Sequence, residues 1–300
     1  MKKIIVIGSS NTDMVIKTKN FPAPGETILG GKFLMNSGGK GANQAVAAAR
    51  LGGTVTFVGK IGDDIFGKQA VQQLENEGIN VNFVVVDPEN PSGVALIIVD
   101  REGENSIVVA PGSNGTLSPA DFDKAIVQLN ESEYILMQLE IPILTVEHIA
   151  RIAVEKRKKV VLNPAPATEL SDKLLKNLYI ITPNETEAEL LTGVKVTDEQ
   201  SALKAATILH DKGVEIVIIT MGAAGAFLLV NGKSEIITAL KVQAIDTTAA
   251  GDTFNGALVV ALSEGKTIQE SIAFANKAAS ISVTRIGAQS SVPFRKEILN

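Results

Sequence analysis

The chain has 300 residues, of which 45% are hydrophobic and 20% are charged, a balance typical of a well-packed globular enzyme. Its formal net charge of −5 gives no reason to expect binding to nucleic acid or to a membrane, because both favour a basic face. The sequence has no cysteine and only two histidines, His148 and His210, which excludes disulfides and thiolate chemistry and disfavours a multi-histidine metal site or a Ser-His-Asp triad.

The segment 3–8 (KIIVIG) is the first predicted strand. Its apolar run is too short for the hydrophobic region of a signal peptide, and Asn11 and Asp13 follow soon after it. No apolar run elsewhere reaches the length that spans a membrane. We therefore expect a cytoplasmic protein that begins with a buried strand.

Short β-branched runs alternate with helix-like segments along the chain. The predicted strands are 3–8, 54–59, 134–139, 159–163, 178–182 and 215–220, with a strand-like stretch at 240–245 (LKVQAI). The predicted helices are 42–51, 66–77, 119–129, 144–156, 185–191, 198–212, 253–263 and 268–283. Most of these strands are apolar on both faces, as strands covered by helices on both sides should be. The alternation predicts an α/β fold with a central, mostly parallel sheet flanked by helices.

Two segments, approximately 14–34 and 93–110, break this alternation. Each resembles extended chain that does not cross over through a helix. They fit either a small β-sheet lid that projects from the main sheet or ordinary edge hairpins, and the sequence favours neither. Because no repeat or linker is visible, we predict one domain over residues 1–300 with the lid inserted.

Polar residues follow the predicted strands at the edge where open α/β sheets bind ligands. Ordered along the chain, these residues are Asn11, Asp13, Glu140, Asn163, Asn184, Met221-Gly222, Asp246 and Asp252. Each has a simpler explanation as a solvated strand end or helix cap. Their shared position nevertheless predicts a ligand site along one rim of the sheet.

The segment 37–53 (SGGKGANQAVAAARLGG) is rich in glycine just before a predicted helix. Three glycines within four residues let the backbone approach a ligand, while Lys40 and Asn43 could contact it. A flexible turn is the alternative. The segment is not a Walker A loop because no Ser or Thr follows its Gly-Lys, and the GKT at 265–267 fails because Val260 stands where glycine is required. A dinucleotide fingerprint is also missing after the first strand.

Two later motifs have both structural and ligand-binding interpretations. Asn184 followed by Glu187 fits a capping box at a helix start, or a pair facing bound phosphate and its magnesium. The segment 220–225 (TMGAAG) fits a turn between two strands, or a wall against a nucleotide, and the sequence favours the turn.

The segment 246–257 (DTTAAGDTFNGA) places a carboxylate, Asp252, at the start of a predicted helix. The unpaired N–H groups around 249–252 would form an anion pocket at the positive end of that helix. Asp252 could then accept the proton of a hydroxyl group in phosphoryl transfer. Taken alone, the motif favours a plain helix N-cap for Asp252.

Together, these motifs resemble the ribokinase-like carbohydrate kinases. The similarity covers essentially the whole chain and rests on NTD at 11–13, GGKGANQA, NPAPA at 163–167, PNETEAELLTG, TMGAAG, DTTAAGDTFNGA and VTRIGAQSSVP, in the order of the family. The resemblance implies a small β lid over the sugar and transfer of the γ-phosphoryl group of ATP to a sugar hydroxyl, here the 5-hydroxyl of D-ribose, to give ribose 5-phosphate and ADP. It also implies Mg²⁺, an activating K⁺, and a homodimer formed through the lid.

The same resemblance assigns roles by position. The implied sugar contacts are Asn11, Asp13, Gly39, Lys40, Gly41, Ala42, Asn43, Glu140 and Asp252. Asp252 is the implied base, with Ala249, Ala250 and Gly251 as the anion hole. The implied nucleotide contacts are Asn184, Thr220, Met221, Gly222, Ala223, Ala224, Gly225, Gly251, Asp252 and Asn276, with Glu187 near magnesium. The implied monovalent-cation site comprises Asp246, Thr248, Ser282, Arg285, Gly287 and Ser291, several of them through backbone oxygens.

Other functions are weighed against this one. Asn11, Asp13 and Glu140 suit a small polyhydroxylated sugar, with 2-deoxyribose or fructose as alternatives. Aromatic residues are only 4% of the chain, which disfavours a nucleoside such as adenosine that needs stacking groups. A non-catalytic sugar-binding protein would not need the Gly-Asp pair, and a nicotinamide-dependent dehydrogenase would need the missing fingerprint.

Overall fold

The computed structural model describes residues 2–29 and 31–299; residue 30, which falls in the predicted insertion 14–34, lies outside the described residues. Its main sheet has eight strands. In sheet order they are β14 (Lys233–Ile237), β13 (Ala226–Val230), β12 (Ile216–Thr220), β11 (Ile180–Ile181), β10 (Lys159–Leu162), β9 (Ser132–Met137), β1 (Lys3–Ile7) and β4 (Val55–Val58). All neighbouring pairs are parallel except β12–β13 and β13–β14. The prediction of a mostly parallel sheet is confirmed.

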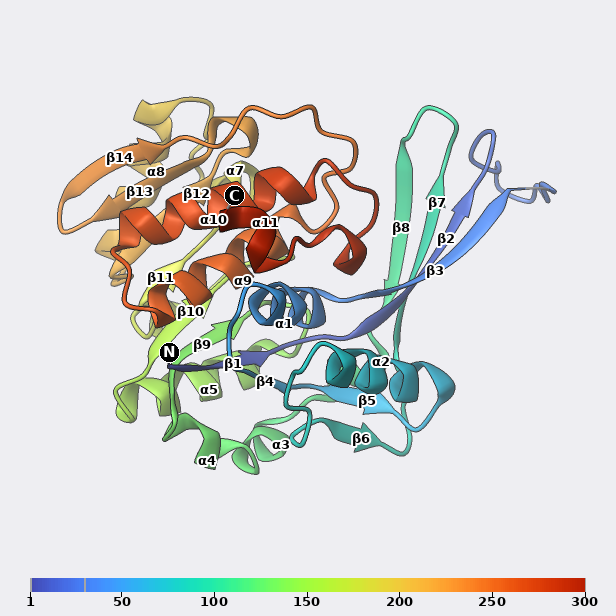
Figure 1. Cartoon of the computed structure of the whole chain (residues 1–300), viewed down its shortest axis with the longest axis horizontal. Helices are drawn as coiled ribbons and strands as arrows, with labels where there is room; N and C mark the ends of the chain where they lie inside the picture. Colours follow the sequence, from blue (N-terminus) through green and yellow to red (C-terminus); the bar gives the residue numbers. More distant parts are fainter. Residues whose placement is uncertain (1, 30, 300) are drawn as a thin grey trace.

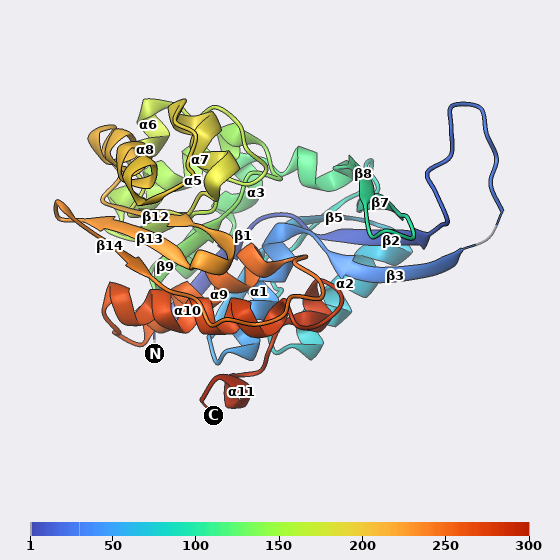
Figure 2. The same ribbon diagram turned by 90° about the horizontal axis from the view of Figure 1, so that it is seen from above.

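Helices cover both faces of this sheet (Figure 2). One layer contains α3 (Pro119–Asp123), α4 (Ile126–Leu129), α5 (Ile143–Glu155), α6 (Asp172–Leu175), α7 (Glu185–Thr192) and α8 (Glu199–Asp211). The other contains α1 (Lys40–Arg50), α2 (Ile65–Asn76), α9 (Ala250–Ser263), α10 (Ile268–Ser282) and α11 (Arg295–Leu299). No helix in the described ranges is long and apolar enough to cross a membrane.

The strand β1 shows why the predicted strands carry no polar face. Ile5 and Ile7 pack into the core on one side of the sheet, and Ile4 and Val6 pack into the core on the other side. All four side chains are fully buried. Burying such a side chain stabilises the fold by roughly 1.5–3 kcal/mol.

Two sequence expectations are corrected by the structure. The predicted helix 119–129 is two short helices, α3 and α4, separated by a turn at Lys124–Ala125. The turn lets Phe122, Ala125 and Leu129 all pack into one core. The strand-like stretch 240–245 is not a strand, because it has no partner strand and its apolar side chains Leu240, Val242 and Ile245 are exposed.

A second, four-stranded sheet projects from the body (Figure 1). Its strands, in order, are β3 (Lys32–Gly38), β2 (Asn11–Lys17), β7 (Gly93–Val99) and β8 (Asn105–Ala110). It contains both segments that broke the βα alternation, so ordinary edge hairpins on the main sheet are the wrong interpretation. We call these four strands the lid sheet. It begins at Asn11 and reaches Gly38, wider than the predicted segment 14–34.

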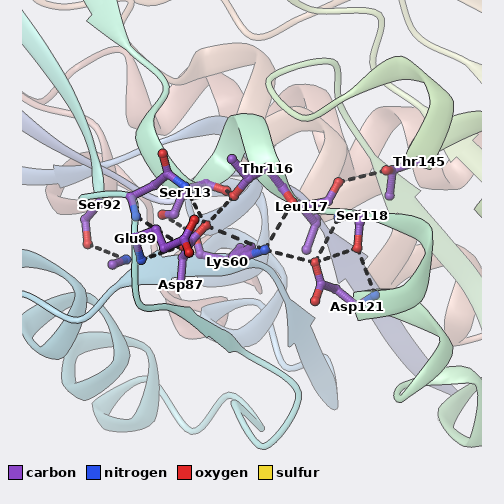
Figure 3. A network of polar contacts seen from close by, with 12 residues as sticks. Lys60, Asp87, Glu89, Ser92, Ser113, Thr116, Leu117, Ser118, Asp121 and Thr145 are labelled. Carbon is purple, nitrogen blue, oxygen red and sulfur yellow. Dashed lines mark hydrogen bonds and ion pairs between the residues drawn. The ribbon is translucent and has the colours of Figure 1, made fainter.

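A buried polar network lies where the lid sheet joins the body (Figure 3). Its side chains come in part from β5 (Lys60–Gly62), β6 (Val85–Asp87) and the 3₁₀ turn η1 (Gly112–Thr116) after β8. The Lys60 ammonium donates to Asp121 at 3.2 Å and lies 3.6 Å from Asp87. The hydroxyl of Thr116 donates to Asp87 and holds the pKa of that carboxyl below its ordinary range. We call Lys60, Asp87, Thr116 and Asp121 the lid-root network.

Candidate active site

Asp252 lies in the first turn of α9, but it does not cap the helix. The N-cap residue is Ala249, in the left-handed conformation with φ of 57°, so a plain cap is the wrong interpretation for Asp252. Its carboxylate is only 6% exposed and points toward α1. One oxygen accepts from Asn43 Nδ2 at 3.0 Å and the other from Gln44 Nε2 at 2.9 Å. Asp252 therefore lies directly against the helix that follows the GGKG turn.

The backbone ahead of Asp252 presents free donors. Within the described residues, the N–H groups of Gly251 and Asp252 have no protein acceptor, as expected at a helix N-terminus. Gly251 is exposed, and a Cβ added to it would meet nothing within 4 Å. A left-handed alanine costs roughly 1–3 kcal/mol, a strain that often marks functional sites. These N–H groups could accept an anion.

The glycines before α1 allow close backbone contact. A Cβ on Gly41 would stand 2.6 Å from the backbone of Gly8 and Ser9, so only glycine lets α1 start against the end of β1. Gly39 has φ of 86°, which also favours glycine. Glu140, which follows β9, accepts the N–H of Lys40 at 3.0 Å and the Ser9 hydroxyl. This packing brings the carboxyl ends of β1 and β9 to the start of α1.

Four carboxylates, those of Asp13, Glu140, Glu187 and Asp252, and one lysine share this region. Burial raises the pKa of Asp13 to about 6, and the negative charges of Glu140 and Asp252 add to the rise. Burial lowers the pKa of Lys40, but the charges of Asp252, Glu140 and Glu187 more than offset this, so the net shift is upward. Lys40 therefore stays protonated at neutral pH, inside a cluster of acidic side chains.

A cavity of about 780 Å³ opens beside Asp252, a size that suits a small-molecule ligand. Among the predicted ligand residues, its lining includes Lys40, Asn184, Glu187, Thr220, Gly222, Ala223, Gly225, Ala249, Ala250, Gly251, Asp252 and Asn276. Met221 and Ala224 are outside this lining; Met221 packs against the core instead. The remaining predicted sugar contacts are also outside it, namely Asn11, Asp13, Gly39, Gly41, Ala42, Asn43 and Glu140. Asp252 and Lys40 thus stand where the cavity meets this second, more acidic group.

Sequence reasoning missed the apolar part of the cavity wall. Its members are Leu240, Val242, Phe254, Ala279 and Val283. Leu240 and Val242 belong to the stretch 240–245 that was expected to be a strand. These exposed side chains line the cavity, where they could contact a flat apolar ligand group. The place of this stretch in the cavity wall can be recognised only once the edge of the sheet is known, because the sequence does not show that the stretch has no partner strand.

The motif at α7 forms the predicted capping box and also faces the cavity. Asn184 and Glu187 form a complete capping box, with bonds of 2.8 and 2.9 Å, and both also line the cavity. Burial raises the pKa of Glu187, although its bond from the Asn184 N–H and the charge of Lys40 act against the rise. No cluster of three acidic or histidine side chains suited to a metal occurs in the described part of the chain. Glu185, Glu187 and Asp252 are the carboxylates in the cavity lining, and carboxylate oxygen is a ligand type that Mg²⁺ prefers.

Three of the predicted monovalent-cation residues, Asp246, Thr248 and Gly287, are joined by hydrogen bonds between two segments. Asp246 accepts the N–H of Thr248 at 2.9 Å and the N–H of Gly287 at 2.8 Å. Burial acts to raise the pKa of Asp246, but these hydrogen bonds outweigh it and the net shift is downward. The Arg285 guanidinium pairs with Glu297, so only its main chain is free to contribute. One carboxylate beside backbone carbonyls is a donor set that suits a hard cation.

The fold and this arrangement define the class of protein. Residues 1–295 match the pfkB family of carbohydrate kinases. The chain therefore belongs to the pfkB carbohydrate kinase family.

Individual relatives and one solved structure are similar to the chain over nearly its whole length. The chain is 53% identical to a ribokinase from Haemophilus influenzae, over 99% of this chain and 97% of the relative. It is 40% identical to a deoxyribokinase from Salmonella typhi, over 97% of this chain and 95% of the relative. The crystal structure of ribokinase from Arabidopsis thaliana, complexed with ribose and ATP, matches with a TM-score of 0.92 at 33% identity, covering 99% and 97% of the two chains.

Proposed function

We propose that the chain is an ATP-dependent kinase that phosphorylates D-ribose at its 5-hydroxyl, giving ribose 5-phosphate and ADP. The observation that carries this proposal is the place of Asp252, which lines the cavity and is also bonded to Asn43 in the predicted sugar group. One carboxylate can thus reach both an alcohol and the end of a nucleotide. Identity of 53% to a ribokinase supports the choice of sugar.

In the proposed reaction, Asp252 orients the sugar hydroxyl and accepts its proton. The hydroxyl oxygen forms a bond to the γ-phosphorus while the bond to the β–γ bridging oxygen breaks, and ADP leaves. The N–H groups of Gly251 and Asp252 stabilise the charge on the transferring group, and the Lys40 ammonium adds to this effect. The N–H of Ala250, which was also predicted to serve the anion hole, donates to the carbonyl of Thr247 at 3.2 Å instead. When bound, Mg²⁺ would neutralise charge on the phosphates, and we expect Glu187 to be the residue near it.

The nucleotide occupies the cavity in this proposal. Its base packs against the apolar wall of Leu240, Val242 and Val283, and its phosphates extend toward α9 and α7. Asn11, Asp13, Gly39, Asn43 and Glu140 hold the sugar on the other side of Asp252. A protein that consumes ATP needs a cellular nucleotide pool, so a cytoplasmic location remains our expectation.

A panel of sugars tests the proposed substrate. ADP release is measured with D-ribose, 2-deoxyribose, fructose and adenosine. We expect the highest kcat/KM with ribose, because a site that hydrogen-bonds a hydroxyl rejects the analogue lacking it. A higher kcat/KM with 2-deoxyribose would assign the chain to the activity named for its deoxyribokinase relative. No ADP release with any acceptor would contradict a kinase.

Activation by a monovalent cation is a second part of the proposal. A bound K⁺ would tie Asp246 and its loop to the segment 282–291 and so order the backbone that leads into the anion donors. We expect potassium to raise the rate above that in sodium and to raise the melting temperature. The variant Asp246→Asn should lose most of both responses, whereas equal rates in the two salts would remove the cation site.

We further propose a homodimer formed through the outer face of the lid sheet. Because strand side chains alternate between faces, Asp13 and Ile16 point to opposite sides. The face of Ile16 carries the exposed apolar side chains Phe33, Met35, Leu96 and Val108. Such a patch usually marks an interface.

Sedimentation analysis checks the proposed dimer. Val108→Lys should shift the protein toward a monomer, while Val127→Lys, an exposed valine on α4, should not. A monomeric wild-type protein would contradict the proposal.

A further inference from the structure

The hydrogen bonds of Asp252 belong to a longer chain of buried amides. Gln44, on α1, donates from Nε2 to Asp252 at 2.9 Å and to Asn163 at 3.0 Å. Its Oε1 accepts from Gln138 Nε2 at 2.6 Å. Gln44 and Gln138 are both 0% exposed. These three bonds leave the Gln44 amide one orientation, with its nitrogen toward Asp252.

The same chain continues to the anion donors. Asn163 donates to the carbonyl of Thr182, and the Thr182 hydroxyl donates to Asn255 at 2.7 Å. Asn255 then donates to the carbonyl of Gly251 at 2.8 Å. One set of buried side chains therefore contacts both Asp252 and the peptide that carries an anion-hole N–H. These hydrogen bonds restrict the relative position of the two ends of the network, although Gln138 Oε1 has no hydrogen-bond partner among the described residues.

We propose that Gln44 is a positioning residue that fixes the plane of the Asp252 carboxylate and favours its ionised form. The amide cannot take up the proton that Asp252 receives, and an N–H donated to a carboxylate stabilises the charged state. The inference rests on the proposed kinase function and adds a residue that does not itself touch either substrate.

Other charges around Asp252 come from several elements. Lys40 at the start of α1 favours the carboxylate, while Asp13 on β2, Glu140 after β9 and Glu187 on α7 disfavour it. Gln44 supplies one of the two side-chain amide N–H groups that the Asp252 carboxylate accepts, and an N–H donated to a carboxylate stabilises the charged form. Removing Gln44 should therefore move the acid limb of the rate profile to higher pH.

The experiment compares Gln44→Met with the wild-type enzyme in ribose-dependent ADP release from pH 5 to 9. Methionine keeps the approximate shape of the side chain and removes the amide. We expect kcat to fall by roughly 10- to 100-fold at pH 7, with KM for ribose and ATP changed by less than about 2-fold. Raising the pH should recover part of the lost kcat, which a purely structural defect would not do.

Two further variants keep the test decisive. Gln138→Met leaves the Gln44 amide in place but frees its orientation, so it should show the same pH signature with a smaller loss of kcat. Thr145→Val removes a buried hydrogen bond on α5, outside the catalytic residues, and should leave the pH profile unchanged. If Gln44→Met does not fold, Gln138→Met decides the question.

The outcomes separate this inference from the proposed function. If both glutamine variants keep the wild-type kcat and an unshifted pH profile, the positioning role of Gln44 is wrong and the proposed kinase function stands. A wild-type protein that releases no ADP with any sugar overturns the kinase proposal and, with it, the role of Gln44.

Discussion

The polar network around Asp252 and the lid-root network use different chemistry. Around Asp252 in the body, the hydrogen-bonding partners are neutral amides, Asn43 and Gln44. At the lid root, the ammonium of Lys60 lies between the carboxylates of Asp87 and Asp121. Both networks join segments that are far apart in the sequence.

The difference follows from what each network must do. A cation paired with Asp252 would stabilise its charge so strongly that the carboxylate would be a poor base, whereas amides orient it and leave its charge in place. Lys40 affects Asp252 only at longer range, since no ion pair between them occurs in the described residues. In the proposed reaction the lid root takes no part in proton transfer, so its ion pairs can fix the geometry without affecting the base.

The largest expected effect comes from Asp252→Asn, which removes the charge but keeps an isosteric side chain. We expect kcat to fall by about 10²- to 10⁴-fold because the base is lost. Binding of ribose, measured by calorimetry, should change little, and the melting temperature should stay near that of the wild type. Near-normal turnover would end the assignment of Asp252 as the base.

Removing the cation of the lid-root network tests the other side of the comparison. Lys60→Met leaves two carboxylates without their shared partner and should lower the free energy of unfolding by about 3 kcal/mol. We expect KM for the sugar to rise while kcat stays within about 3-fold. The reason is that the lid sheet loses ion pairs at its junction with the body, whereas the contacts of Asp252 are unchanged. Urea unfolding and steady-state kinetics measure both effects. As a control, Lys68→Met removes an exposed pair with Asp63 and should cost at most about 1 kcal/mol.

Asp13 lies on strand β2 of the lid sheet, and ionising its carboxyl group lowers the free energy of unfolding. With a pKa of about 6 in the folded state and an ordinary value of 3.8, it binds a proton more tightly when folded. Ionising it therefore destabilises the fold as pH rises from about 4 to 6, by at most about 3 kcal/mol, and this penalty persists above pH 6. Asp13→Asn should match the wild type near pH 3.5 and be more stable at pH 7.

Urea unfolding at the two pH values measures this difference. The exposed carboxylate of Asp63 provides the matched control, because Asp63→Asn should give no such divergence between the two curves. A constant stability difference between Asp13→Asn and the wild type at both pH values would contradict the buried-charge explanation.

The smallest expected effect comes from a neutral member of the lid-root region. Thr145 donates to the carbonyl of Leu117 at 2.8 Å and is 1% exposed (Figure 3). Thr145→Val should cost about 1 kcal/mol in urea unfolding and leave kcat and KM unchanged. If Thr145→Val lowered the free energy of unfolding as much as Lys60→Met, the charge of Lys60 would not explain its contribution to stability.

The fold was predictable wherever one local pattern sufficed. Strands such as β1 and β12 are apolar on both faces, and only a sheet covered on both sides satisfies that pattern. The stretch 240–245 has the same composition but became a loop, because β14 is the edge of the sheet and no strand lies beyond it in the described residues. Whether an apolar stretch pairs depends on a neighbour that the stretch does not specify.

The candidate site shows the same division. Asp252, Lys40 and Asn184 could be selected from their motifs, because glycine-rich turns and helix starts have recognisable local signals. Gln44 and Gln138 could not, although Gln44 lies inside the GGKGANQA motif, because nothing in the sequence around either residue indicates what its amide contacts. Their importance arises from a contact between α1, β9 and α9 that brings together positions more than 90 residues apart.

By itself, the sequence determined the alternation of strands and helices, the glycine-bearing turns and the residue types able to hold a phosphate and a hydroxyl. Those features depend on backbone preference and side-chain chemistry, which act over a few residues. Only the tertiary structure decided that Asp252 turns away from its own helix end toward α1, and that its partners are amides rather than cations. Burial and hydrogen-bond pairing are properties of the packed chain, because they depend on what every other segment leaves uncovered.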